Sequence, residues 1–416
     1  MVFGLVLLLL ALFGAPLFAI IASSALWSYH REEIDLSALV IEFFSIAEMP
    51  VLLAIPLFTF AGYVLSESQA PGRLVRLSQA LLGWMPGGLA IVALAACAFF
   101  TAFTGASGVT IIALGAILYP ALSQAGYEPK FNLGLVTSAG SLGLLFAPSL
   151  PLILYGIVAQ VPIDDLFLAG ILPGMLMLVM LAGWSLWVNR GTAQPLAAFS
   201  SKKVFAALRE SIWELPLPIV VLGGIYSGYF AVSEAAAVTA LYAVIVEVFI
   251  LREISLKQLP DIMRESMLLV GGILVILGVS LASTNIMIDT EAPQQLLAWI
   301  SGYVSSPTTF LLLLLLFLLA LGAILDIFSA LVLVVPLILP VALQYGIDPI
   351  HLGMIFLATM QLGYLTPPVG LNLFIASYRF ERPITEVYAA TLPFLLILLL
   401  SVIVITFWPS LSLVFL

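Results

Sequence analysis

Residues 104–134 read TGASGVTIIALGAILYPALSQAGYEPKFNLG, and residues 321–353 read LGAILDIFSALVLVVPLILPVALQYGIDPIHLG. Both stretches set helix-breaking Gly and Pro within apolar sequence, and the breakers recur at one fixed spacing. The matching positions, all 220 residues apart, are Pro120 and Pro340, Gly126 and Gly346, Pro129 and Pro349, Gly143 and Gly363, and Pro148 and Pro368. Such matched breaks in the two halves of an apolar chain indicate a membrane protein built from two related repeats.

The composition places the whole chain in a membrane. It is 63% hydrophobic and 8% charged over 416 residues, which leaves too little polar surface for a soluble domain. Apolar runs long enough to span a bilayer recur from end to end. The first run, residues 2–27, has no charge and is too long for the apolar region of a signal peptide, so it is predicted to be a retained span. The single cysteine, Cys97, excludes an intrachain disulfide.

Charged clusters divide the apolar runs into an all-α, multi-pass arrangement. Spans are predicted near residues 2–28, 38–66, 131–160, 165–189, 215–232, 234–251, 265–288, 351–378 and 385–415. Two further apolar regions, 88–120 and 309–344, are broken near the middle by TGASG and LDIFS. Each of these regions is either two short spans or one re-entrant hairpin.

The basic residues predict the orientation. With a cytoplasmic N-terminus, the inner loops hold 12 of the 13 Lys and Arg residues, and only Arg31 falls outside. The C-terminus is then periplasmic. The first broken region is entered from the inside and the second from the outside, so the halves 1–191 and 215–416 are predicted to be inverted repeats. The polar stretch 192–214 between them is expected to be a cytoplasmic amphipathic connector.

Four breaks could carry chemistry: residues 104–108, 143–149, 322–329 and 363–369. Broken helices persist in lipid only where protein or a water-filled cavity covers them. Freed carbonyls and Ser or Thr hydroxyls suit a small alkali cation, and the N-termini of half-helices suit a carboxylate. The alternative, that Gly and Pro only kink packed helices, accounts less well for four breaks in two matched halves.

Single residues leave alternatives open. Asp326 is either a functional intramembrane carboxylate or the N-cap of the helix that follows it. Asn372 places an amide in an apolar helix just beyond the last break. No nucleotide-binding loop, hydrolase motif or metal-ligand pattern is visible, so an ion gradient is the expected driving force and no enzyme activity is expected.

At these residues the chain resembles the large membrane subunit of tripartite ATP-independent periplasmic (TRAP) transporters. The resemblance runs from LLAIPLFTFAGYVLSES (52–68) and LLGWMPGGLA (81–90) through FFTAFTGASG (99–108) to GIDPIHLGMIFLATMQLGYLTPPVGLNLF (346–374). Two departures stand out. The first hairpin tip of the family usually reads Ser-Gly-Ser, where this chain has Thr104-Gly105-Ala106, and one of two usual prolines is replaced by Ala147.

The resemblance implies an elevator-type Na⁺/organic-anion symporter in the bacterial inner membrane. Its implied partners are a small four-helix membrane subunit and a periplasmic substrate-binding protein. Carried over by motif, the sodium ligands are Thr104, Ser107, Gly143, Phe146 and Pro148 in the first half, and Asp326, Gly363, Thr366 and Val369 in the second. The predicted substrate contacts are Gly105, Ser149, Pro367, Pro368 and Asn372.

Two other functions stay open on sequence alone. A stand-alone Na⁺/dicarboxylate symporter would share the hairpins and the inverted repeats but would need no soluble receptor. A non-transporting membrane scaffold or channel subunit would not need polar breaks at matched depth. The sequence does not name the organic anion.

Overall fold

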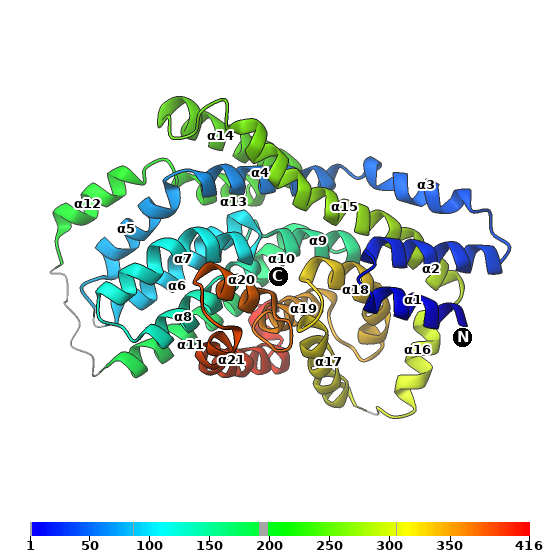
Figure 1. Cartoon of the computed structure of the whole chain (residues 1–416). Coiled ribbons are helices and arrows are strands. Elements are labelled where there is room, and N and C mark those ends of the chain that lie inside the picture. The colour runs from blue at the N-terminus through cyan, green and yellow to red at the C-terminus, as the bar shows by residue number, and fades with distance from the viewer. Residues whose placement is uncertain (1, 86, 191–198, 305) are drawn as a thin grey trace.

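The chain folds into a bundle of helices, many of which run side by side (Figure 1). The computed structural model describes residues 2–85, 87–190, 199–304 and 306–416. Within these ranges every regular element is helical. Seven helices are long and apolar enough to cross a membrane, and an eighth crossing is counted if the bent pair 129–145 and 150–159 forms one span. The predicted all-α, multi-pass class is therefore confirmed.

The described residues of the first half form eleven α-helices and three short helical turns. They are α1 (Val2–Leu12), α2 (Leu17–Arg31), α3 (Ser37–Ser45), η1 (Ile46–Glu48), η2 (Pro50–Leu53), α4 (Ala54–Glu67), α5 (Ala70–Leu82), α6 (Gly88–Thr104), α7 (Ser107–Gln124), α8 (Pro129–Ala139), η3 (Leu142–Leu145), α9 (Leu150–Ala159), α10 (Ile163–Ala169) and α11 (Ile171–Asn189).

In the described residues that follow, the connector holds α12 and the second half holds ten further α-helices, of which α14 continues into a π-helical stretch, η4. They are α12 (Ser201–Glu210), α13 (Pro216–Tyr226), α14 (Val232–Val244), η4 (Ile245–Ile250), α15 (Leu259–Asp289), α16 (Ala292–Ser301), α17 (Pro307–Gly322), α18 (Ile327–Gln344), α19 (Pro349–Gly363), α20 (Leu371–Arg379), α21 (Ile384–Phe407) and α22 (Ser410–Leu413).

Helix boundaries in the two halves follow the spacing of the sequence motif. Both ends of α7 and α18 lie 220 residues apart, and α8 and α19 begin at the matched prolines Pro129 and Pro349. After α7, the amides of Gly126 and Tyr127 bond back to Ser123 O and Leu122 O. The same two bonds recur after α18, where glycine again supplies the positive φ (85° at Gly126 and 74° at Gly346) that ends the helix.

The predicted single span at 2–28 is wrong. The chain reverses after α1, because Gly14 takes a φ of 83° and Pro16 cannot continue the helix. The helices α1 and α2 fold back on each other, and the ring of Phe3 stacks on Trp27 with centroids 4.6 Å apart. At 1.5 Å per residue, the 11 residues of α1 reach only about 17 Å, too short to cross a bilayer.

Other predicted spans also differ from the observed helices. The run 38–66 is interrupted at Met49, which is extended before Pro50 (φ −91°, ψ 101°), so that α4 begins a separate helix. The run 215–232 holds only the 11 residues of α13. Two amphipathic helices, α5 and α16, lie where connections were expected. In the predicted connector 192–214, residues 192–198 lie outside the described part of the chain, and the helix α12 follows them.

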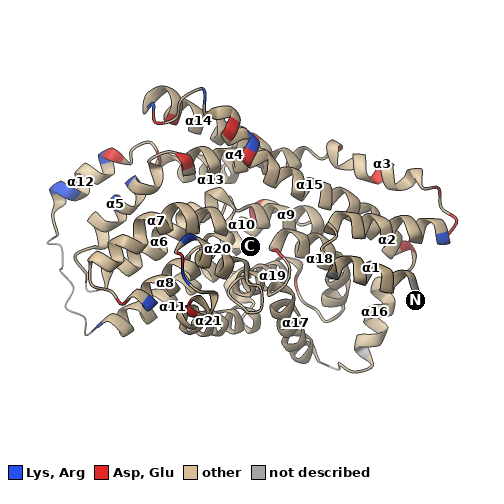
Figure 2. Ribbon diagram, in the orientation of Figure 1, with Lys and Arg blue, Asp and Glu red and all other residues tan. Residues whose placement is uncertain are grey.

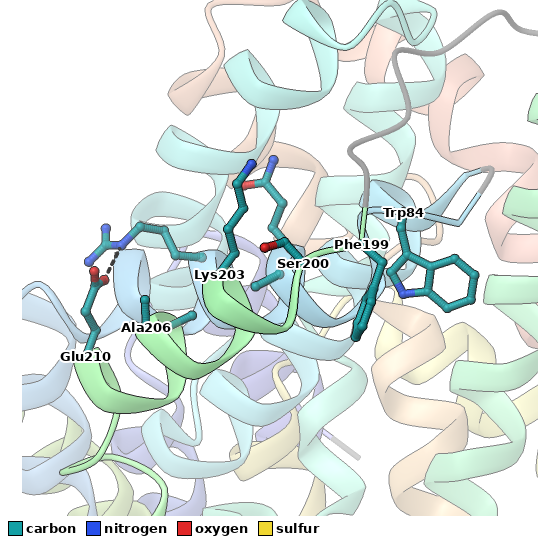
Figure 3. A pocket seen from close by; sticks show the side chains of 10 residues that line it. Trp84, Phe199, Ser200, Lys203, Ala206 and Glu210 are labelled. Carbon is teal, nitrogen blue, oxygen red and sulfur yellow. Dashed lines mark hydrogen bonds and ion pairs between the residues drawn. The ribbon is translucent and has the colours of Figure 1, made fainter.

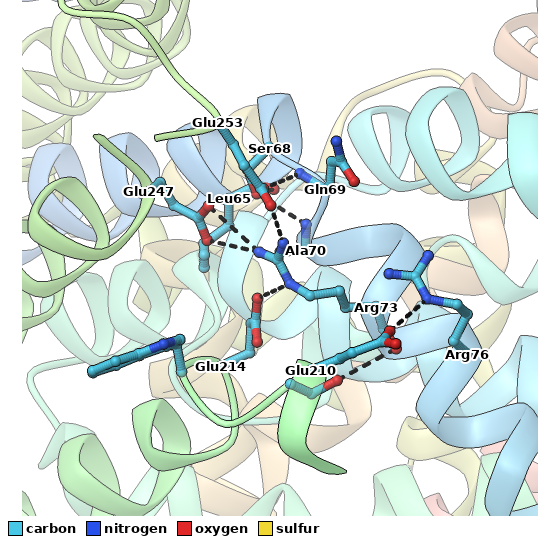
Figure 4. A network of polar contacts seen from close by, with 12 residues as sticks. Leu65, Ser68, Gln69, Ala70, Arg73, Arg76, Glu210, Glu214, Glu247 and Glu253 are labelled. Atoms are coloured by element: carbon cyan, nitrogen blue, oxygen red, sulfur yellow. Dashed lines mark hydrogen bonds and ion pairs between the residues drawn. The ribbon is translucent and has the colours of Figure 1, made fainter. Parts of the chain in front are cut away.

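Charged residues lie mostly at helix ends and in connections, and the middle of the bundle carries few of them (Figure 2). A buried ionic cluster surrounds Arg73, which lies in the first turn of α5 and is 5% exposed (Figure 4). Its Nε donates to Glu214 Oε1 at 2.5 Å, Nη2 lies 3.3 Å from Glu247 Oε1, and Nη1 pairs with Glu253. The cluster joins α5 to the end of the connector and to η4. Burial raises the pKa of Glu214, although the guanidinium of Arg73 opposes the shift.

Candidate functional site

The first break is a turn between α6 and α7, within the TGASG stretch. Gly105 takes a φ of 63°, in the left-handed region that favours glycine. A Cβ on this residue would lie 2.4 Å from Leu150 Cγ, so the turn rests directly on the first residue of α9. The turn that precedes α7 therefore lies against the N-terminus of α9, a helix end whose first backbone N–H groups have no partner within the helix.

The second predicted break packs against α6. A Cβ on Gly143 would lie 2.3 Å from Ala98 O, so only glycine allows this approach. Pro148 and Ser149 are buried, whereas Phe146 is half-buried and its ring covers Gly174 of α11. The hydroxyl of Ser149 is buried and has no hydrogen-bond partner among the described residues. This oxygen lies at the N-cap of α9 but accepts no hydrogen bond from the start of that helix.

The hydroxyls that flank the first turn are both buried. Thr104 Oγ1 lies 3.5 Å from Ala106 O, at the limit of a hydrogen bond, and Ser107 is the first residue of α7. A tighter polar contact lies one turn away and was not predicted: Thr101 Oγ1 is 2.7 Å from Thr110 Oγ1 and donates to Gly140 O at 2.9 Å. In the sequence, the two threonines lie at similar spacings before and after Gly105. This spacing is the pattern that could have identified the pair.

In the second half, Asp326 is the N-cap of α18. Its Oδ1 accepts from the amides of Phe328 and Ser329 at 2.9 and 3.0 Å, and Oδ2 accepts from Ser329 Oγ at 2.5 Å. Of the two roles left open by the sequence, the structure shows the capping role. The carboxylate is half-buried, so it still places negative charge at the break.

The remaining residues of the second half gather around Asp326. A Cβ on Gly363 would lie 2.5 Å from Gly322 Cα, so α17 and α19 touch backbone to backbone. The amide of Ile327 donates to Tyr364 Oη at 2.9 Å, and the amide of Gly370 donates to Ala323 O at 3.2 Å. These contacts tie the start of α18 to the end of α19, and the N-cap of α20 to the end of α17.

The predicted ligands between Gly363 and Gly370 differ in exposure. Thr366 is half-buried and its hydroxyl donates to Leu362 O at 3.1 Å. Pro367, Pro368 and Val369 are exposed on the surface of the chain. The structure therefore brings Asp326, Gly363 and Thr366 into one region and places the three following residues at its edge.

The two halves meet through their broken helices. The helix α9 packs on α18, and α20 packs on α7. Asn372 of α20 is fully buried; its Nδ2 lies 3.4 Å from Thr137 O on α8, and its Oδ1 has no partner among the described residues. A Cβ on Gly108 would lie 2.7 Å from Ile375 Cδ1. The arrangement therefore gathers helix N-termini, which suit anions, beside carbonyl ends and hydroxyls, which suit cations.

A family model described as "Tripartite ATP-independent periplasmic transporter, DctM component" matches residues 1–411. The chain belongs to this family. It is 35% identical over 377 residues to a C4-dicarboxylate TRAP transporter large permease protein DctM of Pseudomonas aeruginosa, covering 90% of this chain and 88% of that protein. This DctM-family chain is thus a TRAP transporter large permease, as the sequence resemblance predicted.

Other relatives carry different substrate names. An ectoine/5-hydroxyectoine large permease protein, UehC of Ruegeria pomeroyi, is 33% identical and spans 87% of this chain and 85% of its own length. An isethionate permease protein, DctMQ of Oleidesulfovibrio alaskensis, is 33% identical over 90% of this chain, which spans 59% of that longer protein. The solved structure of the YdaH transporter of Alcanivorax borkumensis shares the fold at a TM-score of 0.59 and 16% identity, covering 90% of this chain and 88% of that one.

Proposed function

We propose that this permease imports a small organic anion by Na⁺ symport. It receives the anion from a periplasmic substrate-binding protein and works with a small four-helix membrane subunit. The two halves act as inverted repeats, and a transport domain of hairpins and broken helices moves through a scaffold in an elevator-type motion. Sodium is the one cofactor of the proposal. The word "tripartite" in the family description and the relative named DctMQ support the two partners.

One observation carries the proposal: in each half, the break between the two hairpin helices contacts the N-terminus of a half-helix. Gly105 rests on Leu150 in the first half, and Gly370 bonds to Ala323 in the second. Aligned N-termini carry partial positive charge, which suits a carboxylate or another organic anion. The buried free oxygens of Ser149 and Asn372 lie on the same two elements, α9 and α20, and add polar groups that can select a substrate.

The cation is expected beside the same breaks. The neutral oxygens available there are the hydroxyls of Ser107, Thr104 and Thr366, together with main-chain carbonyls at Gly143 and Gly363. The carboxylate of Asp326, already an acceptor for the start of α18, adds negative charge to the second site. Hard neutral oxygens plus at most one carboxylate suit a monovalent alkali cation better than a transition metal.

The test is uptake by the reconstituted tripartite system. Proteoliposomes that hold this chain and its small subunit, supplied with the binding protein and labelled substrate, should accumulate substrate when Na⁺ is on the substrate side. Replacing Na⁺ by K⁺ at equal ionic strength should abolish accumulation. Uptake that is indifferent to this exchange would contradict the sodium assignment. Equal uptake without the binding protein would instead favour a stand-alone symporter, and no uptake under any gradient would favour a scaffold role.

A further inference from the structure

A groove of about 340 Å³ lies between α5 and α12, and none of its lining residues belongs to the four breaks (Figure 3). Its lining combines two cations, neutral polar groups, one acid and two aromatic rings: Arg76, Lys203, Gln79, Ser200, Glu210, Trp84 and Phe199. The charged and polar side chains come from both helices, so the groove exists only where α12 is docked on α5.

The groove carries positive charge that the protein itself does not neutralise. Arg76 Nε donates to Glu210 Oε2 at 2.9 Å, and both side chains are about half exposed. Lys203 also lines the groove and forms no ion pair within the described residues. One arginine, one lysine and one glutamate leave a net positive charge, and the hydroxyl of Ser200 and the amide of Gln79 add neutral donors. This donor set is complementary to a phosphate.

The groove also ends in apolar, aromatic surface. The rings of Trp84 and Phe199 meet edge to face with centroids 6.1 Å apart, and both side chains are exposed. Trp84 lies four residues before the first residue of α6, and α6 is a long apolar helix. Tryptophan at the end of such a helix is typical of the membrane interface, where its ring lies at the level of the headgroups.

The other face of α12 indicates where the helix lies. Groove residues Lys203, Ala206 and Glu210 share one side of the helix, and the opposite side presents Phe205, which is 70% exposed, and Leu208. A helix with exposed apolar side chains and several lysines and arginines lies in the interface plane of a membrane. The groove is therefore at the depth of lipid phosphates rather than in bulk water.

We propose that the groove between α5 and α12 binds the phosphate headgroup of an anionic phospholipid. Lys203 and Arg76 contact the phosphate, and the acyl chains leave past Trp84 and Phe199. A free phosphate ion would use the cations but not the aromatic end, and the positive charge favours an anionic lipid over a neutral one. The inference concerns a surface outside the transport site and does not depend on which substrate is carried.

The experiment measures lipid affinity of the full-length chain in a neutral detergent. Phosphatidylglycerol is titrated in and the bound lipids are counted by native mass spectrometry, with phosphatidylcholine as the neutral probe. Lys203→Gln should weaken the tightest phosphatidylglycerol site about fivefold, the effect of one basic residue near an anionic lipid. The matched control is Lys202→Gln, which removes the same charge from the neighbouring position outside the groove and should change affinity little.

Several outcomes would overturn the proposal. Equal losses for Lys202→Gln and Lys203→Gln would mean diffuse attraction without a site. Equal binding of phosphatidylcholine, or full competition by inorganic phosphate at constant ionic strength, would exclude an anionic-lipid headgroup site. Displacement of the lipid by the small membrane subunit would assign the groove to a protein interface. Since Lys203 is exposed, both variants should melt at the wild-type temperature in phosphatidylcholine, which separates lipid binding from folding.

Discussion

Removing Arg73 should destabilise the protein far more than removing its neighbour Arg76. Arg73→Leu leaves three carboxylates, Glu214, Glu247 and Glu253, facing one another without a cation. The side chains of Glu214 and Glu247 are 3% and 0% exposed, so water cannot replace the guanidinium. Arg76→Leu breaks only the pair with Glu210, whose side chains are 51% and 52% exposed.

The magnitude follows from these distances. At an effective dielectric constant of about 20, a charge pair near 3 Å interacts by roughly 5 kcal/mol, and desolvation and repulsion among the carboxylates offset much of the total. Removing one partner of a buried ion pair lowers the unfolding free energy by about 3–5 kcal/mol, whereas an exposed ion pair contributes about 0–1 kcal/mol. We therefore expect Arg73→Leu to lose about 3–5 kcal/mol of unfolding free energy and Arg76→Leu less than about 1 kcal/mol.

The assay is equilibrium unfolding of both variants in the same detergent, followed by circular dichroism. Adding Glu247→Gln to Arg73→Leu removes one of the stranded charges and should recover part of the loss. If Arg73→Leu were no more destabilised than Arg76→Leu, the cluster would be solvated in the protein and its apparent burial would not govern its energy.

Four further predictions concern the sodium site, the helix packing, the ionic cluster and the inversion of the two halves. Ser107→Ala and Thr366→Ala should each raise the Na⁺ concentration for half-maximal uptake, because each removes a neutral oxygen; the loss should be about 1–3 kcal/mol at buried Ser107 and smaller at half-buried Thr366; unchanged sodium dependence with poorer expression would indicate a structural role. Gly363→Ala should cost about 1–3 kcal/mol of unfolding free energy by overpacking, since its Cβ would lie 2.5 Å from Gly322 Cα, whereas Gly272→Ala, with nothing within 4 Å, should be neutral or slightly stabilising. Since burial raises the pKa of Glu214 above its usual value of 4.5, this group contributes stability at low pH that is lost as pH rises through the raised pKa, and Glu214→Gln should flatten that part of the stability–pH curve; an unchanged slope would assign the titration elsewhere. In a Cys97→Ala background, Gln124→Cys should react only with a reagent supplied inside and Gln344→Cys only with one supplied outside; labelling from one side would mean that the halves are parallel.

The positions of the helix breaks could be predicted because Gly and Pro act on the local backbone. Gly105 ends α6 through its own positive φ, and Pro129 and Pro349 each sit at the first residue of a helix. For Gly143, the sequence could predict only that the position requires glycine, and not that it lies against α6. Its partner, Ala98 O, comes from tertiary packing.

The parts that could not be predicted depend on long-range partners. Arg73 looked like one more basic residue of a cytoplasmic loop, because its three carboxylates lie more than 130 residues away in the chain. The positions of Ser149 and Asn372 beside breaks made their oxygens candidates, but only the packing shows that no group in the described part of the chain bonds to them.

The N-terminal hairpin was missed although its signal is local. Averaging hydropathy over residues 2–28 hides Gly14 and Pro16, which reverse the chain. In Figure 1 the N-terminus and the connection after α2 lie at the same end of the molecule. No full crossing separates the N-terminus from Arg31. Placing Arg31 outside therefore no longer predicts a cytoplasmic N-terminus. The predicted entry of the two broken regions from opposite sides does not depend on that first crossing. It rests on the charges that flank α6–α7 and α17–α18, so the inversion of the halves can be tested at Gln124 and Gln344 whichever side the N-terminus occupies.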